Sequence, residues 1–298
     1  MSKRGNKSIK PRRQVVMVIV EGQSDENALY VSLTEAFEAK YGEDVNVLFA
    51  RIKNENDTEG GDITSRSGAC PDKLHMLMNK LIVMPCLDDY SLMPKYITEI
   101  VHIIDVDGVY IDDTQVLQVD ADTPLLHPIY EDASILANDP DKIRERNARK
   151  RDNIDALLAF QKVGFSIQNF VDTGHGNKPT TKPHTVPYAL YYFSCNLDHF
   201  TVNDRNLDRY TKVYRADIFA RQYGNSVDDF VGFLKNDTAA IKDLSYEDSW
   251  AMLKRGNNSL GRYTNNILFP INGCMLCRAA TVRALGQRSN FRSRQRHT

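Results

Sequence analysis

The chain has 298 residues, of which 42% are hydrophobic and 26% are charged, and its formal net charge is −1. This composition predicts a globular protein with a sizeable core, and it excludes both a low-complexity chain and a cysteine-dense disulfide scaffold. No apolar run approaches the ~20 residues that a membrane-spanning helix needs. We therefore expect no membrane contact, a cytoplasmic location and reduced cysteines.

The first part of the chain predicts a basic arm followed by a strand, a helix and a second strand. Residues 1–13 contain six bases and no acid. The apolar, β-branched run 15–20 is typical of a buried strand, and 45–52 predicts another. Between them, the spacing of apolar residues in 24–40 predicts an amphipathic helix.

The next part predicts an exposed loop and then a return to the sheet. Residues 54–71 are polar and glycine-rich, which indicates a loop that either touches substrate or is a plain surface insertion. Residues 72–84 and 91–99 are predicted to be helical. The apolar run 99–105 predicts a further parallel strand.

Four acidic residues follow the first and third of these strands: Glu21, Asp25, Asp105 and Asp107. Parallel strands end at one edge of a sheet, where open α/β sheets bind their ligands, so we expect these acids to converge. Four neighbouring carboxylates need a compensating charge, and hard oxygen ligands suit Mg²⁺ or Mn²⁺. If the strand continues, Asp105 and Asp107 point to the same face and share the ion. The alternative is that Glu21 and Asp25 cap a helix N-terminus, whose dipole favours anions.

The pairing of these motifs resembles a known family. Glu21-Gly22 at a strand end, Asp25 at the start of the next helix and Asp105-Val106-Asp107-Gly108 at a later strand end resemble the Toprim domain of topoisomerases, bacterial primases, small ribonucleases and overcoming-lysogenisation-defect nucleases. The resemblance implies a Rossmann-like parallel sheet flanked by helices. It also implies that Glu21 is the general acid/base, that Asp105 and Asp107 are metal ligands, and that Asp25 supports the metal. Asp105 comes 84 residues after Glu21, which implies an insertion relative to compact Toprim domains.

A basic segment opens the next predicted helix, 141–163. Residues 142–151 contain six bases and one acid, Glu145. Positive side chains on one segment are typical of a surface that binds phosphates. We expect nucleic-acid contacts from Arg144, Arg146, Arg149 and Lys150. The alternative is an ordinary solvated helix face.

The last predicted strand of the sheet is the aromatic run 187–193. As a fourth parallel strand it would bring Asn196 and Asp198 to the acidic edge, where they would add a ligand or an orienting group, or serve a purely structural role. The remainder predicts a smaller, mainly helical appendage with helices at 217–235 and 246–254. The predicted organisation is a basic arm (1–13), a Toprim-like catalytic domain with insertions (14–200), a C-terminal helical region (201–285) and a basic tail (286–298).

Acidic strand ends beside separate basic segments predict an enzyme that acts on a polyanion. The expected activity is that of a divalent-metal-dependent endonuclease, which cleaves phosphodiester bonds in DNA or RNA. Resemblance to stand-alone Toprim nucleases implies an effector of bacterial anti-phage defence, an ATPase partner and a possible homo-oligomer. The alternative is a non-catalytic Toprim protein that binds nucleic acid or docks a partner. Cys274 and Cys277 lack a second pair at zinc spacing and are expected to be core thiols.

Overall fold

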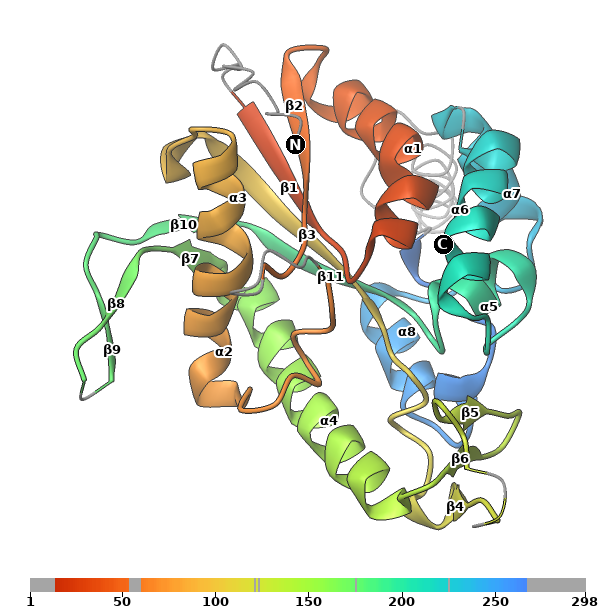
Figure 1. Ribbon diagram of the computed structural model, residues 1–298. Helices are drawn as coiled ribbons and strands as arrows, with labels where there is room; N and C mark the ends of the chain where they lie inside the picture. Colours follow the sequence, from red (N-terminus) through yellow and green to blue (C-terminus); the bar gives the residue numbers. More distant parts are fainter. Residues whose placement is uncertain are drawn as a thin grey trace, which may run out of the picture.

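A four-stranded parallel sheet with helices on both faces forms the centre of the molecule, in the strand order β11–β3–β1–β2 (Figure 1). The computed structural model describes residues 14–53, 60–120, 122, 124–174, 176–224 and 226–266. The sheet strands are β1 (Gln14–Ile19), β2 (Val45–Ala50), β3 (Ile97–Asp105) and β11 (Tyr188–Phe193). The expected α/β class and the fourth parallel strand are confirmed.

The apolar runs of the sheet are continuous because both faces of the sheet are covered. In β1, every residue after Gln14 is buried, and Val16 and Val18 face one core while Met17 and Ile19 face the other. Residues that alternate along a strand point to opposite faces, so only a strand covered on both sides keeps apolar residues at every position. The sheet therefore divides the core into two layers.

Three helices cover one face of the sheet, and they include two from the C-terminal half of the chain (Figure 1). They are α1 (Gln23–Tyr41), α6 (Arg209–Tyr223) and α7 (Val227–Asn236). Phe219 of α6 and Phe230 of α7 share one apolar cluster with Leu29 and Leu33 of α1 and with Val18 of the sheet. The helices predicted as a C-terminal appendage thus complete the core of the sheet.

The opposite face is covered by helices from the middle of the chain and by α8. They are α2 (Pro71–Met78), the π-helix Asn79–Val83, α3 (Met84–Asp89), α4 (Pro140–Val163) and α8 (Tyr246–Leu253). Leu74, Leu87, Leu157 and Trp250 meet in the second apolar cluster. The 24-residue helix α4 runs from the carboxyl edge of the sheet across this face, and its predicted bounds are confirmed to within a residue (Figure 1).

Short strands and turns complete the described part of the chain. One small sheet lies beyond the carboxyl edge and contains β4 (Val116–Gln118), β5 (Ile129–Tyr130) and β6 (Ile135–Ala137). A two-part ribbon projects on the other side and contains β7 (Phe165–Ile167), β8 (Phe170–Asp172), β9 (Asn177–Pro179) and β10 (His184–Val186). The remaining elements are α5 (Leu197–Val202) and the 3₁₀ turns Pro94–Tyr96, Asp113–Gln115 and Asn258–Leu260.

Two predicted helices differ from the structure. Residues 91–99 are not an α-helix: the preceding helix ends at Asp89, Ser91 takes a left-handed φ of 53°, and β3 already begins at Ile97. The predicted helix 217–235 is two helices that break at Gly224, where a Cβ would lie 2.8 Å from the Ala220 carbonyl oxygen. Both errors arise because a short apolar run does not show whether its apolar residues repeat with the period of a helix or of a strand.

The basic arm 1–13, the predicted apolar run 267–271, the pair Cys274 and Cys277, and the tail 286–298 lie outside the described residues. Within the described ranges, no helix is both long enough and apolar enough to cross a membrane.

Candidate active site at the carboxyl edge of the sheet

Six carboxylates and two lysines gather at the carboxyl edge of the sheet. We call the acids the acid cluster: Glu21, Asp25, Asp62, Asp105, Asp107 and Asp198. The two lysines are Lys150 and Lys212, whose ammonium groups form ion pairs with members of the cluster. The expected convergence of strand-end acids is therefore observed, and it includes two residues that sequence reasoning missed, Asp62 and Lys212.

Glu21 and Asp105 meet directly because β1 and β3 are neighbours in the sheet. The backbone N–H of Asp105 donates a hydrogen bond to Glu21 Oε1 at 3.0 Å. One carboxylate oxygen of Asp105 in turn accepts a hydrogen bond from the backbone N–H of Leu197, also at 3.0 Å, at the start of α5. Both acids are thus oriented by backbone groups of adjacent strand ends.

Asp105 and Asp107 do not share one strand face. The strand ends at Asp105, and Asp107 takes a left-handed φ of 55° followed by Gly108 at 67°. A Cβ at position 108 would overlap the Leu260 side chain, so this turn needs a glycine. The backbone N–H of Asp107 donates to the Cys195 carbonyl at 2.8 Å, which ties the turn to the end of β11. The turn sends Asp107 toward α4 and away from the direction that a continued strand would give.

Lys150 lies in the middle of the acids and not on the surface. Its side chain has no exposed area, and its ammonium is 2.7 Å from Asp107 Oδ2, 2.8 Å from Asp62 Oδ2 and 3.9 Å from Glu21 Oε1. Burial lowers the pKa of Lys150, but these carboxylates outweigh it and raise the pKa well above its usual range. In this structure the lysine expected to bind phosphate is instead an internal counter-charge.

Asp62 comes from the glycine-rich loop for which the sequence leaves two readings open, contact with substrate or a plain surface insertion. The Gly61 N–H donates to the Glu21 carbonyl at 2.8 Å, which presses the loop against β1. Asp62 accepts hydrogen bonds from the backbone N–H groups of Thr64 at 2.7 Å and Ser65 at 3.1 Å. Burial raises its pKa, but the charge of Lys150 and side-chain hydrogen bonds from Lys150, Thr64 and Ser65 outweigh burial and lower the pKa to about 2. The glycine pair before it was the available signal in the sequence.

A second group of acids lies at the start of α1 and α5. Asp198 pairs with Lys212 of α6 through a contact of 2.9 Å between Oδ2 and Nζ. Asp25 accepts a hydrogen bond from the Gly22 N–H at 2.8 Å, which is a capping contact at the N-terminus of α1. Asn196 likewise caps α5 by accepting a hydrogen bond from the His199 N–H at 2.8 Å. The capping alternative therefore describes Asp25 but not Glu21, and the cap at Asn196 agrees with the structural alternative for that residue.

Glu21, Asp25 and Asp105 hold their protons more tightly than isolated carboxyl groups. Burial, followed by the charge of Asp62, raises the pKa of Glu21 well above its usual value. Burial and the neighbouring Asp25 and Asp107 do the same for Asp105. The pKa of Asp25 rises to about 6, chiefly because of burial. Two ammonium groups thus leave part of the negative charge of the acid cluster uncompensated.

The three α4 arginines for which nucleic-acid contacts are predicted donate hydrogen bonds to backbone carbonyl groups around the site. Arg144 donates to the carbonyl oxygens of Asp113 and Val116, and Arg149 donates to that of Ser65. Arg146 donates to the Tyr130 hydroxyl at 2.9 Å and to the Asp107 carbonyl at 3.2 Å. These contacts fix the loops that surround the acids; a role in phosphate binding stays a prediction.

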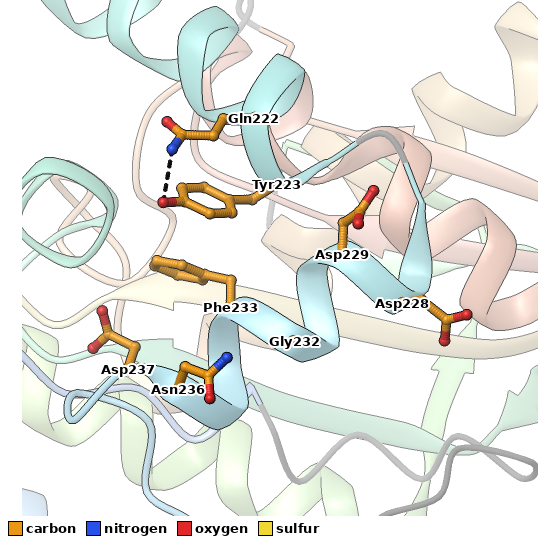
Figure 2. Close-up of a pocket in the computed structure, with 8 residues that line it drawn as sticks. All are labelled: Gln222, Tyr223, Asp228, Asp229, Gly232, Phe233, Asn236 and Asp237. Atoms are coloured by element: carbon orange, nitrogen blue, oxygen red, sulfur yellow. Dashed lines mark hydrogen bonds between the residues drawn. The ribbon is translucent and has the colours of Figure 1, made fainter.

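An open pocket of about 550 Å³ lies between the ends of α6 and α7, apart from the acid cluster (Figure 2). In it the rings of Tyr223 and Phe233 lie 4.6 Å apart, and the Gln222 amide donates to the Tyr223 hydroxyl at 2.8 Å. Tyr223 is eleven residues beyond Lys212 on the same helix, or about 16 Å along its axis. The pocket contains no member of the acid cluster.

No family model matches the chain, and neither the curated proteins nor the solved structures provide a match. Among the described residues, no three His, Cys, Asp or Glu side chains form a ready-made metal-binding group. The acid cluster is therefore the basis for the proposed function.

Proposed function

We propose that this chain is a divalent-metal-dependent nuclease that hydrolyses phosphodiester bonds in DNA or RNA. The observation that carries the proposal is the convergence of six carboxylates around only two ammonium groups at the carboxyl edge of a parallel sheet. That edge is where open α/β sheets bind ligands. The resemblance of Glu21-Gly22 and Asp105-Val106-Asp107 to the Toprim motifs gives the proposal its chemistry.

The donor set fits Mg²⁺ or Mn²⁺. Both ions prefer hard oxygen ligands and are held by a few carboxylates together with substrate phosphates. Glu21 and Asp105 have raised pKa values because they are buried among like charges, and a bound cation relieves that repulsion. Asp105 and Asp107 would hold the ion with Asp25 in support. Lys150 engages Asp107 in the present arrangement, so metal binding requires the ammonium to move or to share this carboxylate.

Glu21 is the proposed acid/base. A bound metal would polarise a phosphoryl oxygen and lower the pKa of the attacking water. Glu21 is suited to moving the proton because burial and the charge of Asp62 raise its pKa well above the usual carboxyl value. The hydrogen bond from the Asp105 N–H holds one of its oxygens in place. Lys150, at 3.9 Å from that same oxygen, keeps positive charge beside the reacting groups.

The biological setting rests on the Toprim resemblance alone. By that resemblance the chain would be an anti-phage effector, working beside an ATPase and in a possible homo-oligomer. The choice between DNA and RNA is left to experiment.

The test is cleavage by the purified chain with end-labelled DNA and RNA pools, in EDTA, Mg²⁺ or Mn²⁺. We expect cleavage only with metal, and a loss of about 10²- to 10⁴-fold in the single-turnover rate for Glu21→Gln with its melting temperature preserved. Asp228→Asn serves as the matched control, because Asp228 lies on the first turn of α7, outside the acid cluster. Equal cleavage rates in EDTA and in metal would refute the proposed metal dependence. Full activity of Glu21→Gln would refute the proposed role of Glu21.

A second candidate function is favoured by one observation. The Lys150 ammonium already forms ion pairs with Asp62 and Asp107, as in a structural ion-pair network. A non-catalytic protein that binds nucleic acid or docks a partner could keep such a network without turnover. Binding to the same pools without cleavage under any metal condition would support this candidate.

A further inference from the structure

The outer side of α6 presents two exposed tyrosines close together. Tyr210 is 88% exposed and Tyr214 is 65% exposed, and Val213 beside them is 39% exposed. We call these three residues the tyrosine face. Aromatic rings bury a large area when they find a partner, so two adjacent, solvent-exposed rings are unusual unless something covers them. Ala216 and Phe219, on the other side of the same helix, are buried in the core.

The tyrosine face lies on the same turns of α6 as Lys212, which contacts the acid cluster. Tyr210 and Val213 flank Lys212 on the first turns of α6, and Lys212 reaches inward to Asp198 at 2.9 Å. Asp105 and Asp107 also lie close enough to raise the pKa of Lys212, although burial opposes them. The same helical turns thus contact the acids on one side and solvent on the other.

Positive charge borders the tyrosine face. Arg209 and Arg215 are both exposed, one preceding Tyr210 and one following Tyr214. Exposed bases beside exposed aromatic rings are the combination that binds single-stranded nucleic acid, since the rings stack on bases and the cations hold the backbone. A docking site for an ordinary apolar partner surface would not need the two arginines.

We propose that the tyrosine face is a stacking platform for unpaired bases of the nucleic-acid strand that reaches the acid cluster, so that the preferred substrate is single-stranded. The inference rests on the proposed nuclease function for the fate of that strand, but not for its binding. Tyr210 and Tyr214 are one helical turn apart, about 6 Å along the axis. This exceeds the rise of about 3.4 Å per nucleotide in a duplex strand. The two rings therefore match bases that are unstacked and spread apart.

Binding can be measured apart from cleavage. Fluorescence anisotropy in EDTA would follow a labelled twelve-nucleotide oligothymidine, an oligouridine of equal length and a mixed-sequence duplex. For the full-length double variant Tyr210→Ala/Tyr214→Ala we expect at least tenfold weaker binding of the single strands and about twofold or less change for the duplex. Tyr210→Phe/Tyr214→Phe keeps the rings and should bind normally.

Tyr90→Ala is the matched control, because Tyr90 is also exposed, at 37%, but follows α3 and is not part of α6. Normal binding in this variant, with unchanged circular dichroism melting in all variants, supports the proposal. Unchanged single-strand binding by the double alanine variant would overturn it. So would self-association of the wild-type chain that the alanine variant loses while nucleic-acid binding is unaffected. Tyrosine-dependent binding without metal-dependent cleavage would instead refute only the nuclease function.

Discussion

Lys150→Met removes the counter-charge at the centre of the acid cluster while keeping most of the side-chain volume. The ammonium lies 2.7 Å from Asp107 and 2.8 Å from Asp62, with no exposed area. Removing one partner of a buried ion pair costs about 3–5 kcal/mol, because the remaining charge is left without compensation. We therefore expect the free energy of unfolding at pH 7 to fall by about that amount, and the melting temperature by about 5–10 °C.

The pH dependence of the loss distinguishes charge from packing. Without Lys150, burial raises the pKa of Asp62, because the charge that lowers it is gone. A group with a raised pKa contributes stability that is present at low pH and is lost as the pH rises through the folded-state pKa. The deficit of the variant should thus shrink from pH 7 to pH 5. A pure packing defect would be the same at both pH values.

Urea unfolding followed by circular dichroism at the two pH values provides the measurement. Lys254→Met is the control, because Lys254 pairs with Asp155 at 2.7 Å while both side chains are partly exposed. Surface pairs contribute about 0–1 kcal/mol, so this variant should change little. Our account of the acid cluster is wrong if Lys150→Met loses no more stability than Lys254→Met. Adding Mn²⁺ should restore part of the stability if the proposed metal site exists.

Two further variants test the geometry around the site. The folded-state pKa of Asp62 is lowered to about 2, so ionised Asp62 contributes about 2 kcal/mol to the free energy of unfolding above pH ~4. This contribution is lost as the pH falls toward 2. Urea titrations should therefore show that Asp62→Asn is destabilised at pH 7 but not near pH 2. Gly108→Ala should cost about 1–3 kcal/mol and weaken the site, since its Cβ would overlap the Leu260 side chain at a left-handed φ of 67°. Gly68→Ala, at a similar φ of 78°, has no atom within 4 Å of its Cβ and tests the effect of backbone strain alone; equal losses in the two glycine variants would contradict the overlap argument.

The sheet and its acidic edge could be predicted from the sequence because the signal is local. Buried parallel strands are read directly as apolar runs, and Glu21 and Asp105 follow such runs immediately. Topology then brings strand ends together without any further information. The same argument located Asp198 after the last strand, where the structure also has it.

The charge balance of the site could not be predicted because it depends on tertiary contacts. Lys150 lies among six other bases in α4, and nothing local distinguishes the one that turns inward from those that face loops and solvent. Lys212 lies nearly two hundred residues from Glu21 in sequence. Asp62 belongs to a polar loop without periodicity. The role of each of these residues depends on a partner that is distant in the sequence.

The position of the lysines in the chain has a consequence for folding. Glu21, Asp62 and Asp107 all precede Lys150, so a chain that folds during synthesis produces the acids before their counter-charges. The contact from Asp105 to Glu21 spans 84 residues and that from Leu197 to Asp105 spans 92, and contacts of such separation form slowly. The apolar strands can pair early, whereas their carboxyl edge reaches its native charge balance only after α4 and α6 have docked.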